Sequence, residues 1–397
     1  MPAPSCVIRR SRRARGIGAL ACISLLFALG ATGTCGLVSF ERTYPFGYSS
    51  EAWAVRQTAD QGFVIAGVTD VEVEGGDLDG DALVVKTDRF GNVEWQENLG
   101  ANDIEMAASV ARAPDGGYVI GGSTLVTGGA SSYLVKLDAN GGELWHKSFE
   151  PASFLSIVTS VEPTGDGGYI LGAATNGAGY YGYLMKTNAT GDPVWKRTVG
   201  AQILAVQPLA DGGFVGLAGA VVSNPSPNLV ERVLVVRTNA AGTVVWQKLV
   251  GYGSPLSLAL EPDGGFLIAG ASQAFGPGDY DAYWLKLDSS GAPVWERHFD
   301  SAGWTERAFA IGRATEGGYF VLASTHDPAP TGGDYSLLLR TDALGTVEWS
   351  RTYGDGTTKP WAGTRATDGD YVFAGEKHND GSADSAFLLK VASDGSG

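Results

Sequence analysis

The chain has 397 residues, and its composition excludes several classes of partner and site before any motif is considered. Charged residues make up only 18% and the formal net charge is −15, so nucleic acid and anionic membranes are poor partners on electrostatic grounds. All three cysteines, Cys6, Cys22 and Cys35, fall in the first 35 residues, which leaves the rest without a disulfide or a thiolate metal site.

The first 35 residues have the pattern of a secretory signal peptide. Five arginines precede an apolar run from about Ile17 to Ala31, which is too short and too interrupted by glycine to predict a membrane span. Cleavage after Gly30 or Gly33 would release a secreted protein, whereas lipidation of Cys35 would anchor it. We therefore expect an extracytoplasmic protein, secreted or attached to the outer membrane or cell surface, with residues 36–397 as its folded part.

The remainder of the chain is a repeat of about fifty residues. Each complete copy ends in the pattern that reads LVVKTDRFGNVEW at residues 83–95. A second marker, DGGYVIGG at residues 115–122, recurs in step with the first and is found in seven copies. The tryptophans that end the copies are Trp95, Trp145, Trp195, Trp246, Trp295 and Trp349.

The second copy indicates what each unit is. Asp115-Gly116 predicts a hairpin with a type I′ turn, which needs positive φ at both central residues. Seven such units predict an all-β fold, a seven-bladed β-propeller of four-stranded antiparallel blades, because a β-solenoid would need shorter rungs and separate domains would need linkers. The four expected strands are rich in Val, Ile, Leu, Tyr and Phe: Ala108–Ala113, Tyr118–Ser123, Ser132–Leu137 and Glu143–Phe149.

The two ends of the repeat array complement each other. The last copy, FLLKVASDGSG at residues 387–397, contains no fourth strand. Val38–Tyr44 matches the tryptophan-bearing strands of the other copies, with Phe40 in the place of the tryptophan. We predict that Val38–Tyr44 completes the last blade beside Phe387–Lys390, which removes the free edges of an open array.

At the residues LDANGGELW (137–145) the chain resembles the tryptophan-docking repeats of quinoprotein-like propellers, including outer-membrane assembly lipoproteins of that fold. DGGYVIGG followed by YLVKLDANGGELW also resembles a broad set of secreted bacterial and archaeal propeller proteins. The resemblance covers about Val38 to Gly397 and implies the fold, not an activity. Quinoprotein dehydrogenases also bring a vicinal cysteine pair, which the body of this chain lacks, so we do not carry over their cofactor.

Two residue series recur once per copy and are expected to be structural. The tryptophans should pack between blades, each contributing on the order of 3 kcal/mol if fully buried. The basic residues at the end of the third strand should pair with turn carboxylates such as Asp60 or Asp115. This basic series comprises Lys86, Lys136, Lys186, Arg237, Lys286, Arg340 and Lys390.

An acidic stretch is the candidate metal site. Asp77, Asp79 and Asp81 alternate with other residues around a glycine, and such oxygen-rich loops can wrap calcium. No glutamate follows at the spacing of an EF-hand, and aspartate also precedes the third strand elsewhere, for example at Asp281. A solvated acidic loop is therefore the competing interpretation, and calcium is the one cofactor that the sequence leaves open.

Loop length indicates a binding face. The turns between first and second and between third and fourth strands are short and uniform, whereas the other connections vary. In a propeller both variable classes emerge on the same face, where aromatic side chains suit contact with a protein or a polysaccharide. The candidate ligand-binding residues are Tyr44, Tyr48, Tyr180, Tyr280, Trp304 and Trp361.

These patterns predict a monomeric, non-catalytic binding or scaffold protein, secreted or surface-anchored, that recognises a protein or a polysaccharide. No catalytic residue is singled out, since the sequence has no GxSxG or phosphate-binding motif and its four histidines are scattered. The competing interpretation is an extracytoplasmic glycosidase or lyase with carboxylates gathered at the axis. A passive envelope component with freely varying loops is the third.

Overall fold

The computed structural model describes residues 38–393 with gaps at 73–77, 101–103, 127–128, 150–154, 176–180, 224–228, 275–279, 302, 330–331 and 380–381. The described residues form 28 strands joined by turns and connections. Within these ranges no helix is long and apolar enough to cross a membrane.

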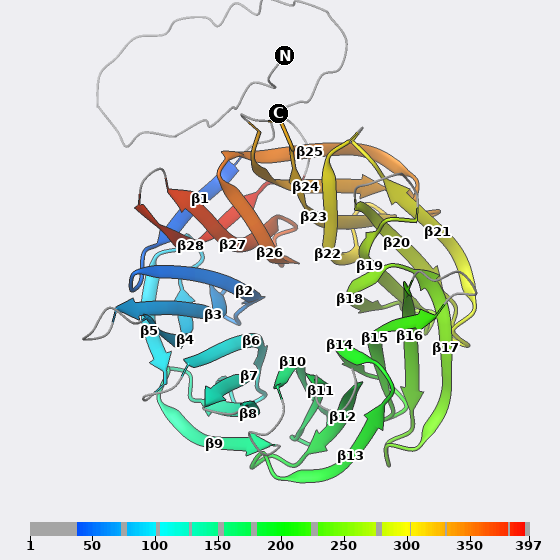
Figure 1. Ribbon diagram of the computed structural model, residues 1–397, viewed down its shortest axis with the longest axis horizontal. Coiled ribbons are helices and arrows are strands. Elements are labelled where there is room, and N and C mark those ends of the chain that lie inside the picture. The colour runs from blue at the N-terminus through cyan, green and yellow to red at the C-terminus, as the bar shows by residue number, and fades with distance from the viewer. Residues whose placement is uncertain are drawn as a thin grey trace, which may run out of the picture.

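The strands form seven four-stranded antiparallel sheets arranged as blades around a central axis (Figure 1). Blade 1 consists of β2 (Ser49–Gln57), β3 (Phe63–Glu72), β4 (Leu78–Thr87) and β5 (Val93–Leu99), and blade 2 of β6 (Ile104–Arg112), β7 (Tyr118–Val126), β8 (Gly129–Leu137) and β9 (Glu143–Phe149). Blade 3 consists of β10 (Ser156–Pro163), β11 (Tyr169–Thr175), β12 (Tyr181–Thr187) and β13 (Pro193–Val199). Blade 4 consists of β14 (Gln202–Pro208), β15 (Phe214–Ser223), β16 (Leu229–Thr238) and β17 (Val244–Tyr252).

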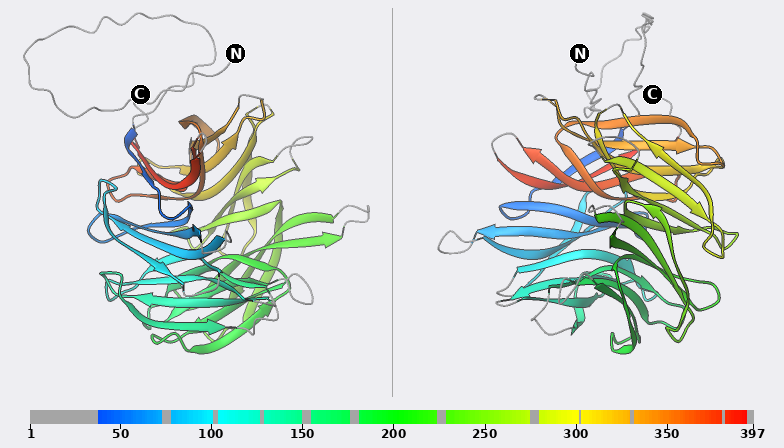
Figure 2. Two further views of the ribbon diagram at one scale, coloured as in Figure 1. Left: turned by 60° about the vertical axis from the view of Figure 1, so that its left-hand side comes forward. Right: turned by 45° about the vertical axis from the view of Figure 1, so that its right-hand side comes forward.

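The remaining three blades continue the ring, and the side views show each sheet twisting from its inner to its outer strand (Figure 2). Blade 5 consists of β18 (Ser254–Leu260), β19 (Phe266–Ser272), β20 (Asp281–Leu287) and β21 (Pro293–Phe299). Blade 6 consists of β22 (Thr305–Arg313), β23 (Tyr319–His326), β24 (Asp334–Thr341) and β25 (Val347–Gly356). Blade 7 consists of β26 (Thr358–Arg365), β27 (Tyr371–Asn379), β28 (Ser382–Val391) and β1 (Val38–Tyr44). The first strand of each blade, from β2 to β26, is its inner strand.

The predicted closure is confirmed. β1 pairs antiparallel with β28, and Phe40 lies opposite Lys390. The same register places each tryptophan opposite the basic residue of the third strand, as Trp95 opposite Lys86. The N-terminal strand therefore occupies the tryptophan-strand position of blade 7, and the described residues form a closed seven-bladed ring.

All four strands predicted for blade 2 are present, but β6 begins at Ile104 rather than Ala108, and the second-to-third hairpins are longer than predicted. Pairing between β7 and β8 continues to Val126 opposite Gly129. In blade 1 the ladder of β3 and β4 continues to Glu72 opposite Leu78. The connections between second and third strands, which loop length predicts as loops, are therefore partly strand, because the ladder of paired residues continues into them.

The predicted type I′ turn at Asp115-Gly116 is wrong. Gly116 has a φ of 88°, but Asp115 is not among the described residues with positive φ. The amide of Gly116 donates to the carbonyl of Ala113, which defines a type I turn followed by a left-handed glycine. Asp115 instead uses its carboxylate, which accepts the amide of Gly117 at 3.0 Å.

The tryptophans pack between blades, as predicted, but they are half-buried rather than fully buried. The Trp95 ring lies 5.8 Å from the ring of Tyr118, the aromatic residue that follows the glycine turn of the next blade. The glycine of the next third-to-fourth turn, Gly141, has a φ of 92° and leaves no room for a side chain above Trp95. The contribution of each tryptophan is therefore below the value for complete burial.

The basic series pairs with turn carboxylates at six of its seven positions. Lys86 contacts Asp60 at 2.7 Å and Lys136 contacts Asp115 at 2.8 Å, with comparable pairs in four further blades. Arg340 instead donates to backbone carbonyls, including that of Tyr319 at 3.2 Å. This series anchors the short turns, so the face that carries them, here called the turn face, is structural in character.

Candidate functional site

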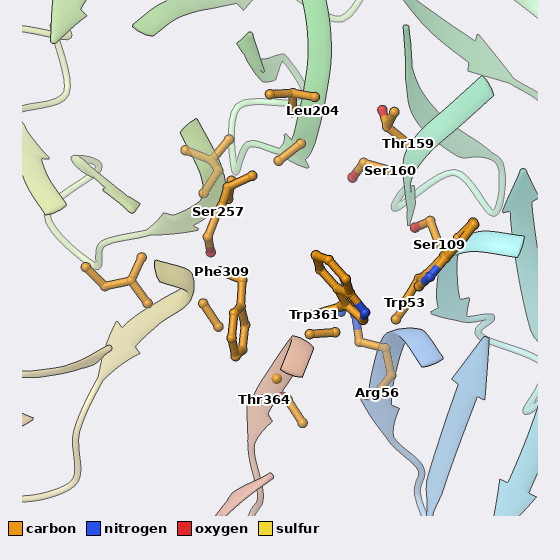
Figure 3. Close-up of a pocket in the computed structure, with 18 of the residues that line it drawn as sticks. Trp53, Arg56, Ser109, Thr159, Ser160, Leu204, Ser257, Phe309, Trp361 and Thr364 are labelled. Carbon is orange, nitrogen blue, oxygen red and sulfur yellow. The ribbon is translucent and has the colours of Figure 1, made fainter. Parts of the chain in front are cut away.

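All seven inner strands have a β-bulge at the same level of the ring. In each, the register with the second strand skips one residue, as at Trp53 between Ala52 and Ala54. A bulge leaves the extra residue unpaired and redirects its side chain. All seven bulge residues line a cavity of about 360 Å³ enclosed by the inner strands (Figure 3). They are Trp53, Ala108, Thr159, Leu204, Leu256, Phe309 and Trp361.

The ring of bulge residues is asymmetric. Phe309, Trp361 and Trp53 belong to three consecutive blades, 6, 7 and 1, and form one aromatic wall (Figure 3). Leu204 and Leu256 face them from blades 4 and 5. Trp361 remains 38% exposed although it lies on an inner strand. The cavity thus offers flat apolar surface on one side, which a ligand with its own flat apolar faces can contact.

Small residues follow the bulges and keep the cavity open. The Ser109 hydroxyl accepts a hydrogen bond from the amide of Val161 at 3.1 Å, and the Ser160 hydroxyl accepts one from Val206 at 3.2 Å. Each serine therefore holds the inner strand of the next blade. The seven residues at this level are Ala54, Ser109, Ser160, Ala205, Ser257, Ala310 and Ala362.

Toward the turn face, an ion pair crosses between blades that are not neighbours. The guanidinium of Arg56 in blade 1 donates to Glu162 in blade 3 at 3.1 Å. Blade 2 lies between them in the ring, and its residue at this level is the small Ala111. The side-chain amide of Gln207 also donates to Glu162, at 3.4 Å. Glu162 is the only carboxylate among the described residues that line the cavity.

Polar contacts link the two tryptophans of the aromatic wall. The Trp53 indole donates to Glu51 at 2.8 Å, and the Glu376 carboxylate is close enough for its charge to act on the Glu51 carboxyl. Lys359 donates to Glu376 at 2.9 Å, and its Nζ lies 4.3 Å from the centre of the Trp361 ring. These contacts fix both indoles and place charged groups beside them.

The Glu51 carboxyl has a raised pKa and so retains a proton more strongly than an isolated glutamate would. Burial raises the pKa of the Glu51 carboxyl, the Trp53 hydrogen bond opposes this, and the charge of Glu376 raises it further. Neither Glu51 nor Glu376 is among the described residues that line the axial cavity, where the competing glycosidase interpretation places its carboxylates.

Two of the predicted ligand-binding residues lie elsewhere than expected. Tyr44 is a buried residue of β1, whose hydroxyl donates to the carbonyl of Gly91 at 2.9 Å. Because Tyr44 lies in the first strand of the chain, the sequence did not show that blade 1 covers this residue. Trp361 belongs to the inner strand β26 and to the cavity, not to a loop.

The other predicted residues do not converge with Trp361. Tyr48 is 59% exposed in the connection from β1 to β2. The Trp304 ring stacks on Tyr335 at 5.9 Å, and Tyr280 lies below the guanidinium of Arg307 at 4.8 Å from its ring centre. Tyr180 lies outside the described residues.

The predicted calcium ligands and the lipidation site are only partly described. Asp77 and Cys35 lie outside the described residues. Asp79 and Asp81 belong to strand β4, opposite Val71 and Thr69, rather than to an open loop. The structure therefore places two of the three aspartates two residues apart in a strand and leaves calcium binding there a prediction.

Sequence reasoning missed Trp53 and Phe309. Both precede a small residue and a buried aliphatic residue, as in Trp53-Ala54-Val55, and the same order is found at Thr159-Ser160-Val161. When the inner strands are aligned on the following glycine turn, this position varies in size from Ala108 to Trp53 and Trp361, whereas the next residue is small in all seven blades. That variation within an otherwise regular repeat is the sequence signal for the cavity residues.

Comparisons with known proteins establish the fold and nothing finer. No protein-family model and no curated protein sequence matches the chain. Among solved structures it is similar to the Dos1 propeller (TM-score 0.51, 10% identity, 89% of this chain and 96% of that chain). It is also similar to the β-propeller domain of the Trilobed protease from Pyrococcus furiosus, described as having an open velcro topology (TM-score 0.51, 9% identity, 87% and 94%).

A third similar structure is a Trp149Ala mutant of the Synechocystis apocarotenoid oxygenase (TM-score 0.51, 12% identity, 78% of this chain and 73% of that chain). The first two structures are both propellers, and the likeness to each extends over most of this chain. At such low identities the likeness carries no activity or ligand. The chain is therefore an all-β, seven-bladed β-propeller of four-stranded antiparallel blades.

Proposed function

We propose that this propeller is an extracytoplasmic, non-catalytic binding protein that holds a polysaccharide segment in its axial cavity. The observation that carries the proposal is the aromatic wall formed by Trp53 and Trp361 on neighbouring inner strands. Sugar rings present C–H faces that stack on indoles, and their hydroxyl edges hydrogen bond to charged groups such as Arg56 and Glu162 of the cavity lining. The propeller fold itself is consistent with a binding or scaffold role.

Aromatic residues on the variable face, outside the cavity, favour a chain-like ligand over a small molecule. Tyr48, Tyr280 and Trp304 lie in or beside the blade connections that surround the inner strands on that face. Arg307 lines the cavity and also contacts Tyr280, which connects the cavity to this outer aromatic surface. A polysaccharide can occupy the cavity with one unit and the surface with others. A protein loop is the competing ligand.

The remaining parts of the proposal concern location and state. The arginine-rich, apolar leader is the basis for placing the protein outside the cytoplasm, either free or anchored at Cys35. We propose a monomer, because closure by β1 completes the ring within one chain. An enzymatic role receives less support, since the described cavity lining contains one carboxylate, which is engaged by Arg56.

The test is a glycan array, together with a pull-down from envelope extracts, using the wild-type protein and the double variant Trp53→Ala, Trp361→Ala. Phe90→Ala is the matched control, because Phe90 is an exposed aromatic residue in a third-to-fourth turn. We expect the wild type and the control to capture a defined set of glycans and the double variant to lose it.

The alternatives give different results. Capture of one envelope protein with no glycan signal would replace the polysaccharide by a protein ligand. Turnover of a captured glycan, detected by mass spectrometry of the recovered ligand, would contradict the non-catalytic role. Glycan capture that survives in a correctly folded double variant would remove the cavity from the proposal.

A further inference from the structure

Three acidic side chains meet between blades 5 and 6, away from the axial cavity. Asp281 begins β20, Asp300 follows β21, and Glu306 is the second residue of β22. One carboxylate oxygen of each lies within 4.8 Å of one from each of the others. Asp281 and Glu306 are buried, whereas Asp300 is exposed, so the cluster is reached from the solvent on one side.

Glu306 is the central observation because it is completely buried. Its Oε1 accepts hydrogen bonds from the hydroxyls of Ser301 and Thr325. Its Oε2 is also inaccessible to solvent and has no hydrogen-bond partner among the described residues. A buried carboxylate oxygen without a donor is costly, and natural structures satisfy nearly all such atoms with a protein group, water or an ion.

Among the described residues, none of the ion pairs formed by lysine, arginine and histidine includes Glu306. Burial raises the pKa of the Glu306 carboxyl to about 7; the hydrogen bonds from Ser301 and Thr325 oppose this shift, and the charges of Asp300 and Asp281 add to it. The neighbours therefore increase the cost of its ionised form, whereas a bound cation would remove that cost.

The other blades provide an internal comparison. In five of the other six blades the residue at the Glu306 position is small, and the residue five positions before the basic residue of the preceding third strand, where Asp281 lies, is not acidic. Glutamate replaces the small residue only at positions 105 and 306, and in both cases the preceding blade supplies an aspartate, Asp81 or Asp281. The equivalents of Glu306 are Ser50, Glu105, Ser156, Ala201, Gly253 and Thr358.

The second pair has the same arrangement but lacks the third carboxylate. Gly100 occupies the place of Asp300, and a Cβ built on it would lie 2.4 Å from Asp81 and 2.7 Å from Glu105. The Asp81 and Glu105 carboxylates therefore converge on this glycine. Paired acidic residues at the same position of two blade boundaries indicate a common role, and the boundary of blades 5 and 6 has the fuller set of oxygen atoms.

We propose that Asp281, Asp300 and Glu306 form a divalent-cation site that binds calcium at the boundary of blades 5 and 6. Three carboxylates and neighbouring hydroxyl oxygens form a hard, all-oxygen ligand set, and no histidine or cysteine belongs to the described cluster, which disfavours zinc. The bound ion joins the third strand of one blade to the inner strand of the next. Its role is therefore to hold the blade connection that carries Trp304.

The test measures calcium binding by isothermal titration calorimetry and the unfolding midpoint in chelator and in calcium. For the wild type we expect one binding event at this site and a rise of the midpoint by about 5 °C at a free calcium concentration a hundred times Kd. Magnesium is titrated separately and should bind more weakly. Glu306→Gln should lose both effects, whereas Glu296→Gln, the same change in the adjacent outer strand β21, should retain them.

Asp300→Asn is the second variant, because Asp300 is exposed and its replacement should not prevent folding. It should weaken calcium binding at least tenfold. Calcium binding that is unchanged in both Glu306→Gln and Asp300→Asn would overturn the proposal. So would a wild-type midpoint that is insensitive to calcium but decreases as the pH rises through about 7, since Glu306 would then hold a proton in place of the ion.

Discussion

The indole of Trp53 donates a hydrogen bond to the carboxylate of Glu51 over 2.8 Å, so a bulge residue of the axial cavity is fixed by a residue two positions earlier in the same strand. Glu51 in turn contacts Glu376 of blade 7, and Glu376 contacts Lys359 beneath Trp361. The aromatic wall therefore depends on charged groups from two blades. Its stability and its geometry should respond together to changes in these groups.

Replacement of Lys359 by methionine should destabilise the protein more at pH 8 than at pH 5. The change leaves the buried Glu376 and its neighbour Glu51 without their cation, and at low pH protonation of Glu51, whose pKa is raised, relieves that charge. We expect a loss of about 2 kcal/mol in the free energy of unfolding at pH 8, measured by urea denaturation. Lys147→Met, which removes an exposed pair with Asp192, should have a much smaller effect at either pH.

Loss of the hydroxyl group should destabilise the protein at Tyr44 but not at Tyr48. Tyr44→Phe removes a buried hydrogen bond to the carbonyl of Gly91 and should lower the free energy of unfolding by about 1 kcal/mol. Tyr48→Phe alters an exposed side chain and should be neutral. Equal effects in urea denaturation would contradict the placement of β1 beneath blade 1.

Two glycine substitutions separate blade packing from backbone strain. Gly242 and Gly212 have φ values of 75° and 80°, so alanine is strained at both, by about 1–2 kcal/mol. Only at Gly242 would the new Cβ collide with the preceding blade, 2.6 Å from Trp195, whereas the nearest atom at Gly212 is 3.8 Å away. Gly242→Ala should therefore destabilise by about 2 kcal/mol more than Gly212→Ala. A smaller effect at Gly242 would show that Trp195 does not pack as described.

The turn carboxylates should make the protein sensitive to strong acid. Hydrogen bonds from the Thr164 hydroxyl and the Lys186 ammonium lower the pKa of Asp166 to about 2. Because the folded pKa lies below the ordinary value, this carboxylate stabilises the fold above about pH 4, and the stabilisation is lost as the pH falls toward 2. Unfolding titrations should show a smaller loss over this range in Lys186→Met. An identical acid profile would mean that the pair contributes nothing.

The repeat made the fold predictable, including closure by Val38–Tyr44, because each tryptophan strand carries the same markers. The turn at Gly116 was predicted with the wrong type, since dipeptide preference does not report that Ala113 accepts the amide of Gly116. The candidate site was predicted less well. Trp361 was identified as a ligand-binding residue but assigned to a loop, and Trp53 was missed, because a bulge depends on pairing that the sequence of one strand does not contain.

The cluster of Asp281, Asp300 and Glu306 was also beyond sequence reasoning. Its members are separated by up to 25 positions and come from two blades, and their proximity follows from the packing of β20 against β22. The sequence prediction selected Asp77, Asp79 and Asp81 for the opposite reason, namely local spacing. The pairing of aspartate and glutamate at two blade boundaries depends on strand register, which the spacing of residues along the sequence does not contain.

The most direct test of the account is the affinity of Trp361→Ala for the glycan captured by the wild type, measured by isothermal titration calorimetry beside the Phe90→Ala control. We predict at least a tenfold increase in Kd for Trp361→Ala, which is a loss of about 1.4 kcal/mol in binding free energy, and no change in Kd for the control. An unchanged Kd in a folded Trp361→Ala protein would contradict binding in the axial cavity.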